Sequence, residues 1–192
     1  MNGLINGDFG IWQRGSSIPM GSGFRFGPDM WAVNSTGSTV AVDRRAFSSS
    51  QTDVPGNPKY TARMTVDSAA GSGNCARFGQ PIEDVRRYAG QIVTWSFYAR
   101  ADTPKNIAIE LRQCFGAGSP ASVSHSNGVQ KIKLTAAWQR FDIGINIASV
   151  DGKGIGPDEN DCLQAIAWLD AGLVAVADPT DHSKIRFLET GE

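Results

Sequence analysis

The sequence predicts an all-β protein: a two-sheet antiparallel β-sandwich of the jelly-roll type, with one short helical turn. Three observations predict it: short segments of alternating apolar and polar residues, turn-forming clusters between them, and a high content of glycine and proline. The 22 glycines and 9 prolines together make up about 16% of the 192 residues, against an average near 12%. Hydrophobic residues reach 41%, enough for a sizeable core. Residues 1–192 show neither an internal repeat nor a linker, so we expect a single domain.

Alternation with a period of two residues predicts the strands, because successive side chains of a strand point to opposite faces. In chain order the alternating segments are 39–43, 59–67, 106–115, 129–134 and 138–147. The pattern is clearest in the second of them, where one face carries Tyr60, Ala62, Met64 and Val66. Eight to ten such strands, separated by turn clusters at 53–58, 70–74, 116–120 and 151–154, are typical of a sandwich or jelly roll.

Two further segments, 92–99 and 162–169, are apolar on both faces. In the second, Ile166 and Trp168 lie opposite Leu163 and Leu169. Runs of this kind are typical of strands that are covered on both sides. We therefore expect central strands, or strands whose second face is buried by a neighbouring subunit.

The helical turn is predicted near residues 81–88. Pro81 suits the first position of a helix, Glu83 complements the positive end of the helix dipole, and Arg86 complements the negative end. We expect this segment to bridge the two sheets across one end of the sandwich.

Charge and composition exclude several classes of function. The 18 basic and 19 acidic residues leave a net charge of −1, which argues against nucleic acid as a partner. No apolar run approaches the roughly 18 residues of a membrane helix, and the N-terminus shows no secretory signal. Cys75, Cys114 and Cys162 are odd in number and widely separated, so we expect them to be reduced, as in a cytoplasm.

The sequence shows no arrangement that predicts catalysis. Neither His125 nor His182 lies in a recognisable catalytic pattern, and no glycine-rich loop matches a phosphate-binding motif. A glycan-cleaving enzyme would need two carboxylates about 5–10 Å apart, for which Asp29 and the acidic group at 158–161 are the candidates. We expect a protein that is not an enzyme.

Aromatic residues near the N-terminus form the first candidate binding site. Trp12 and Trp31 flank a glycine-rich segment, 15–27, that contains Phe24 and Phe26. Loop aromatics stack on sugar rings or anchor protein interfaces, because they present a large area at low entropic cost. The alternative is that these rings close one end of the sandwich. These four residues are our candidate glycan or interface contacts.

A second candidate site is a calcium ion held by acidic residues. Asp158 and Asp161 belong to the densest acidic cluster, which follows a glycine-rich stretch at 152–156. Calcium binds several carboxylate and carbonyl oxygens of a bent loop. The spacing differs from that of an EF-hand, and a solvated loop explains it equally well.

Several segments, taken in order, resemble a module of tailed-bacteriophage virion proteins, found in tail fibres, head fibres and related appendages. They lie at 6–15, 28–31, 80–91, 95–101, 110–116, 138–141 and 185–191, and so span nearly the whole chain. The most specific is the run Gly-Asp-Phe-x-Ile-Trp-Gln-Arg-Gly at residues 7–15. The order is also similar to the jelly rolls of carbohydrate-binding modules.

This resemblance implies a non-enzymatic structural protein of the virion: a capsid decoration, a spike or a tail-fibre component. It implies a homotrimer that assembles in the host cytoplasm by contacts with itself and with other virion proteins, and that attaches to host-surface glycans. The alternative is a carbohydrate-binding module that recognises cell-surface glycans through exposed aromatics. The resemblance also implies a structural calcium ion, ligated by an acidic residue just after the first Gly-x-Phe. Here Gly10 occupies that position, which leaves Asp8 as the candidate ligand, and no other cofactor is implied.

Overall fold

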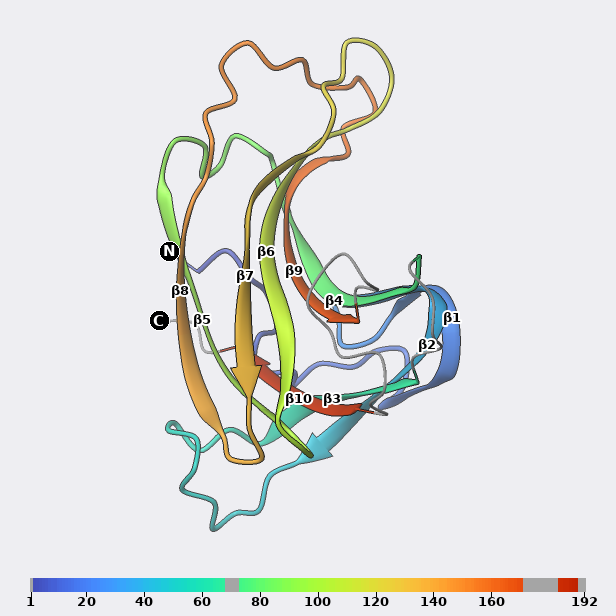
Figure 1. Cartoon of the computed structure of the whole chain (residues 1–192), viewed down its shortest axis with the longest axis vertical. Coiled ribbons are helices and arrows are strands. Elements are labelled where there is room, and N and C mark those ends of the chain that lie inside the picture. The colour runs from blue at the N-terminus through green and yellow to red at the C-terminus, as the bar shows by residue number, and fades with distance from the viewer. Residues whose placement is uncertain (1, 68–72, 171–182, 190–192) are drawn as a thin grey trace.

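The computed structural model describes residues 2–67, 73–170 and 183–189, and these residues form two curved antiparallel layers (Figure 1). The predicted turn at 70–74 and the end of the segment 185–191 fall partly outside the described residues. The strands are β1 (Ser17–Phe26), β2 (Ala32–Ala46), β3 (Tyr60–Asp67), β4 (Cys75–Glu83), β5 (Ile92–Ala101), β6 (Lys105–Phe115), β7 (His125–Leu134), β8 (Gln139–Asn146), β9 (Asp161–Asp170) and β10 (Ser183–Glu189).

Hydrogen bonds connect the strands in the order β7-β6-β9-β4-β2-β3-β10-β5-β8, and β1 pairs with β2. The long strand β2 belongs to both layers, because residues 32–37 pair with β4 whereas residues 39–46 pair with β3. The register shifts at Gly37, where β2 passes from one layer to the other. The first layer consists of β1, β4, β6, β7, β9 and residues 32–37 of β2. The second layer consists of β3, β5, β8, β10 and residues 39–46 of β2.

The core lies between the two layers and is built from the alternating apolar residues. Ile109 and Leu163 from the first layer and Met64, Phe97 and Ile143 from the second belong to one continuous cluster of buried side chains. Each fully buried side chain of this size contributes about 1.5–3 kcal/mol of hydrophobic stabilisation. The alternation that predicted strands therefore also predicts which residues form the core.

The prediction of a helical turn near residues 81–88 is wrong. Pro81 is part of β4 and pairs with Gln164 of β9, and no helix occurs among the described residues. Beyond Gly79, β4 has a partner strand on one side only, and such edges tolerate a proline. After β4, Asp84 adopts a φ of 67°, which breaks any helical path, and residues 85–90 form turns.

The two segments that are apolar on both faces differ from each other in the structure. β5 is a central strand, between β10 and β8, as expected. Within this chain Ile92 is 78% exposed and the outward face continues with Thr94 and Ser96, so cover of this face by a neighbouring subunit stays a prediction. In β9, by contrast, Ile166 is buried although it faces away from the core, and it lies in the groove described below. No helix in the described part of the chain has the length and apolar character that a membrane span requires.

Candidate functional site

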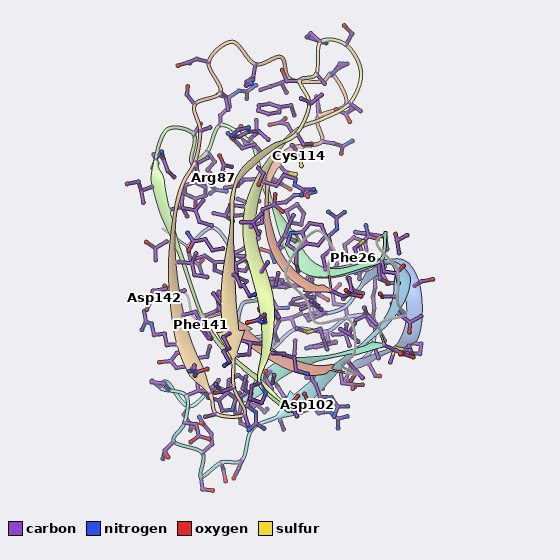
Figure 2. The ribbon with its side chains drawn as sticks, viewed as in Figure 1. Phe26, Arg87, Asp102, Cys114, Phe141 and Asp142 are labelled. Atoms are coloured by element: carbon purple, nitrogen blue, oxygen red, sulfur yellow. The ribbon has the colours of Figure 1, made fainter. Side chains whose placement is uncertain are left out.

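A groove of about 220 Å³ lies on the outward face of the first layer, across β1, β2, β4 and β9. Figure 2 shows Phe26 on this outward side, next to β4. The groove is lined by Phe24, Phe26, Ala32, Asn34, Arg77, Gly79, Gln80, Pro81, Gln164, Ala165 and Ile166.

Strand register brings these residues together, because residues that are paired across antiparallel strands share one face of the sheet. One row crosses the layer from β1 to β7 and consists of Phe24, Asn34, Arg77, Trp168, Ala108 and Lys131. The next row consists of Phe26, Ala32, Gly79, Ile166, Glu110 and Val129. Residues from six strands, distant in sequence, thus form one continuous surface.

Small side chains keep the floor of the groove low. Ala32 and Gly79 lie in the middle of the second row, between Phe26 and Ile166. A Cβ atom at position 79 would collide with the carbonyl oxygen of Ala165 on the neighbouring strand, so this position requires glycine. The depression is therefore a consequence of the close approach of β4 and β9.

Two aromatic rings form one wall of the groove. Phe24 and Phe26 are 60% and 43% exposed, and their ring centroids are 5.0 Å apart in an edge-to-face arrangement. They share a face because they are two residues apart on β1. The guanidinium of Arg14 lies 4.8 Å from the centroid of the Phe26 ring. Large exposed aromatics beside a depression mark a surface that is suited to binding.

A buried carboxylate lies next to the groove. Glu110 accepts hydrogen bonds from Trp168 Nε1 at 2.8 Å and from Arg112 Nε and Nη2 at 3.0 and 2.9 Å. Burial by itself would raise the pKa of Glu110, but the hydrogen bonds from Arg112, Ser126 and Trp168 outweigh it and hold the pKa below its ordinary value. Glu110 is therefore an ionised group whose charge Arg112 neutralises.

Unlike Arg112, Arg77 has no carboxylate partner among the described residues. Its guanidinium lies 5.7 Å from the centroid of the Trp168 ring and lines the groove together with Asn34 and Gln164. Within the part of the chain that the structure describes, the N–H donors of this side chain therefore have no carboxylate partner and can bind a ligand.

Two cysteines lie opposite each other beyond the groove, Cys114 on β6 and Cys162 on β9. Figure 2 shows Cys114 near the upper end of β6. A hydrogen bond from the Cys162 thiol lowers the pKa of Cys114, although burial acts in the opposite direction. The same hydrogen bond, with burial, raises the pKa of Cys162.

The four aromatic candidates from the sequence lie in different environments. Phe24 and Phe26 line the groove. Trp31 is fully buried: its ring stacks on Phe78 at 4.9 Å and its Nε1 donates to the carbonyl of Ile5. The expectation that Trp31 contacts a ligand is therefore wrong, because its ring has no exposed surface. Trp12 is half-buried against the core, and its Nε1 donates to the carbonyl of Phe9 at 2.7 Å.

The acidic candidates accept hydrogen bonds from three separate backbone amides. Asp8 accepts from the amide of Gly10, Asp158 from the amide of Ala117, and Asp161 from the amide of Val85. The described residues contain no group of three or more His, Cys, Asp or Glu side chains arranged to hold a metal ion. The calcium site at Asp8, Asp158 and Asp161 thus stays a prediction from the sequence.

The proposed carboxylate pair of a glycan-cleaving enzyme gains no support from the geometry. Asp29 lies in the loop between β1 and β2, where it accepts a hydrogen bond from the amide of Gln13. Asp158 lies in a different loop, before β9, and its other carboxylate oxygen accepts from Asn160. Asp29 thus ties its loop to the segment before β1, and Asp158 ties its loop to the one that follows β6.

Sequence reasoning missed Asn34, Arg77 and Gln164 as groove residues. In a strand with alternating residues, a polar side chain is expected simply to face solvent. Only the register of β2, β4 and β9 places these three residues in one groove. The sequence did indicate that Ile166 and Trp168 lie on a second apolar face, because the segment 162–169 is apolar on both faces. That second apolar face is the groove side of β9.

Solved structures show the fold. A family 11 carbohydrate-binding module from Clostridium thermocellum, in complex with a β-1,3-1,4-mixed-linked tetrasaccharide, is 9% identical, with 90% of this chain and 95% of that chain covered and a TM-score of 0.51. A family 11 module of a cellulosomal cellulase from the same organism is 12% identical, covers 90% and 96% of the two chains and has a TM-score of 0.50.

A weaker structural match is the enzymatically active domain of tailspike protein 4 of Bacteriophage CBA120. It is 13% identical, with 83% of this chain and 18% of that chain covered and a TM-score of 0.48. No protein-family model and no curated protein matches the sequence. The matches confirm the predicted all-β sandwich of the jelly-roll type, and at these identities they show the fold alone.

Proposed function

We propose that this chain is a non-catalytic module that binds glycans in the groove beside Phe24 and Phe26. The observation that carries the proposal is the exposure of these two rings, 60% and 43%, next to a depression with a floor of small and apolar residues. The fold shared with carbohydrate-binding modules supports it.

The groove offers both kinds of contact that a sugar needs. The C–H face of a pyranose stacks on an aromatic ring, for which Phe24 is the more accessible of the two. Sugar hydroxyls donate and accept hydrogen bonds, and the amides of Asn34 and Gln164 do the same. Glu110 is buried and engaged by Arg112 and Trp168, which suits a structural carboxylate rather than an acid–base catalyst.

The test is binding of the wild-type chain to a glycan panel, followed by calorimetry with the best ligand. Phe24→Ala is expected to weaken binding about five- to thirtyfold, since an interface aromatic contributes roughly 1–2 kcal/mol. Ile92→Ala is the control, because it removes a large apolar side chain, 78% exposed, from the second layer. A folded Phe24→Ala variant with unchanged affinity contradicts the proposal.

We also propose that the module works on a phage particle, as a homotrimeric decoration, spike or tail-fibre component that reaches the virion from the host cytoplasm. The run at residues 7–15 and the order of the remaining segments support this setting. The two proposals are compatible, since adhesion to a host surface is one reason to decorate a virion.

Immunogold electron microscopy of purified particles tests the virion setting, and light scattering of the purified chain tests the trimer. We expect label at a fixed position on each particle and a mass three times that of the 20.5 kDa chain. Unlabelled particles together with a monomeric chain would overturn this second proposal and leave the glycan-binding proposal untouched.

A further inference from the structure

We propose that the groove selects glycans that carry an anionic group, a carboxylate or a sulfate, and that Arg77 binds this group. The inference rests on the proposed glycan-binding function and names the class of ligand.

The first argument is the free charge of Arg77. In the described part of the chain no carboxylate pairs with its guanidinium, which lies over the Trp168 ring at 5.7 Å. A guanidinium has five N–H donors in one plane, and two of them match the two oxygens of a carboxylate or sulfate. Trp168 thus holds Arg77 by its π face and leaves the donors available to a ligand.

The second argument is the charge of the surroundings. Glu110 is already neutralised by Arg112, so this pair adds no net charge to the groove. Arg14, over the Phe26 ring at 4.8 Å, also forms no ion pair within the described residues. Lys131 lies farther along the row of Arg77. Glu83 shares this outward face, but it pairs with Cys162 beyond the residues that line the groove.

Arg77 and Arg112 also favour the thiolate of Cys114, but Cys114 is not among the residues that line the groove. The lining itself is therefore positive, on a chain whose net charge is −1. A field of this kind favours an anionic ligand and disfavours a neutral one that would cover Arg77 without a counter-charge. Asn34, which pairs with Arg77, and Gln164, which pairs with Pro81 four residues farther along β4, remain available for sugar hydroxyls.

The experiment uses the full chain and hexasaccharides of three backbones: β-1,4-glucan, β-1,4-mannan and α-1,4-galactan. Each backbone is supplied in a neutral form, in a form with C6 carboxylates and in an O-sulfated form. Calorimetry at low ionic strength and at 0.5 M NaCl is run on the wild type, Arg77→Gln and Arg77→Lys. The matched control is Arg140→Gln. Arg140 belongs to β8 and forms an ion pair with Asp142, and Figure 2 shows Asp142 on the opposite side of the molecule from Phe26.

On at least one backbone, the wild type is expected to bind an anionic form about tenfold more tightly than the neutral form, as charge-assisted hydrogen bonds to arginine do. The preference should shrink at 0.5 M NaCl, where the Debye length is only about 4 Å. It should disappear in Arg77→Gln, persist in part in Arg77→Lys and remain in Arg140→Gln. The carboxylate and sulfate arms identify which anion is preferred.

Three outcomes overturn the inference. Equal or tighter binding of the neutral forms overturns it and leaves the glycan-binding proposal standing. If Arg140→Gln reduces the preference for the anionic form as strongly as Arg77→Gln does, the positive charge that matters acts outside the groove. Binding of no form on any backbone, together with a negative glycan panel, overturns both proposals. Thermal unfolding of each variant confirms that it is folded.

Discussion

At the scale of single residues, Glu110 shows how a buried charge is retained in a sheet. Its carboxylate is fully buried, and Arg112 and Trp168 both donate to it. Glu110→Gln is expected to lower the free energy of unfolding by about 2–3 kcal/mol, because Arg112 loses its counter-charge and Trp168 part of its hydrogen bond. Urea unfolding at pH 7 measures this, with Glu83→Gln at the exposed end of β4 as the control.

The pH dependence of stability follows from the same residue. The pKa of Glu110 is depressed in the folded state. Its ionisation therefore contributes stability above the unfolded pKa of about 4.3, and this contribution is lost as the pH falls through the lower folded value. Below about pH 5 the wild type should lose stability more steeply than Glu110→Gln. Parallel curves for the two proteins would contradict the depressed pKa.

Cys114 is expected to be reactive at neutral pH. Its lowered pKa increases the fraction of thiolate at neutral pH, and the thiolate is the nucleophile. In a Cys75→Ser background, the rate of alkylation by iodoacetamide should rise with a midpoint below the ordinary thiol pKa of about 8.5. Cys114→Ser removes this phase. A midpoint at pH 8–9 would show that Cys162 does not stabilise the thiolate.

At the scale of elements, the passage of β2 from the first layer to the second depends on Gly37. This residue has a φ of 69° at the register shift, and a Cβ atom there would collide with the side chain of Asn74. Gly37→Ala is expected to cost about 1–3 kcal/mol of stability, as strained positive-φ positions do. Gly144→Ala is the control, because this β8 glycine has open space around its Cα and ordinary backbone angles. Equal melting temperatures for the two variants would contradict a special role of Gly37.

At the scale of the whole molecule, one continuous core joins the two layers. One buried cluster contains Val33 and Phe78 of the first layer, Trp31 just before β2, and Phe97 and Met64 of the second layer. Trp31→Ala is expected to lower the free energy of unfolding by about 3–5 kcal/mol, as deletion of a buried aromatic does. Because the core is shared, far-UV circular dichroism and tryptophan fluorescence should give one unfolding midpoint that shifts by the same amount. Two separate midpoints would show that the layers unfold independently.

The sequence by itself determined the fold class, most strands and the composition of the core. The reason is local: a strand with one buried face must alternate, so Met64, Ile109 and Ile143 are recognisable as core residues without a structure. The local sequence led to a wrong prediction at residues 81–88. Its charged residues suit the two ends of a helix, but Pro81 and Glu83 pair with β9 instead. Pairing partners are non-local and leave no mark in a single segment.

Only the tertiary structure decided what the aromatic and polar candidates do. Trp31 and Phe24 are seven residues apart and equally apolar in the sequence, yet one is fully buried and the other is 60% exposed. The difference arises because Trp31 packs against Phe78 of another strand, whereas Phe24 projects from the outward face of β1. Arg77, Asn34 and Gln164 likewise form a groove only because three strands pair in one register, and register is set by contacts between distant parts of the chain.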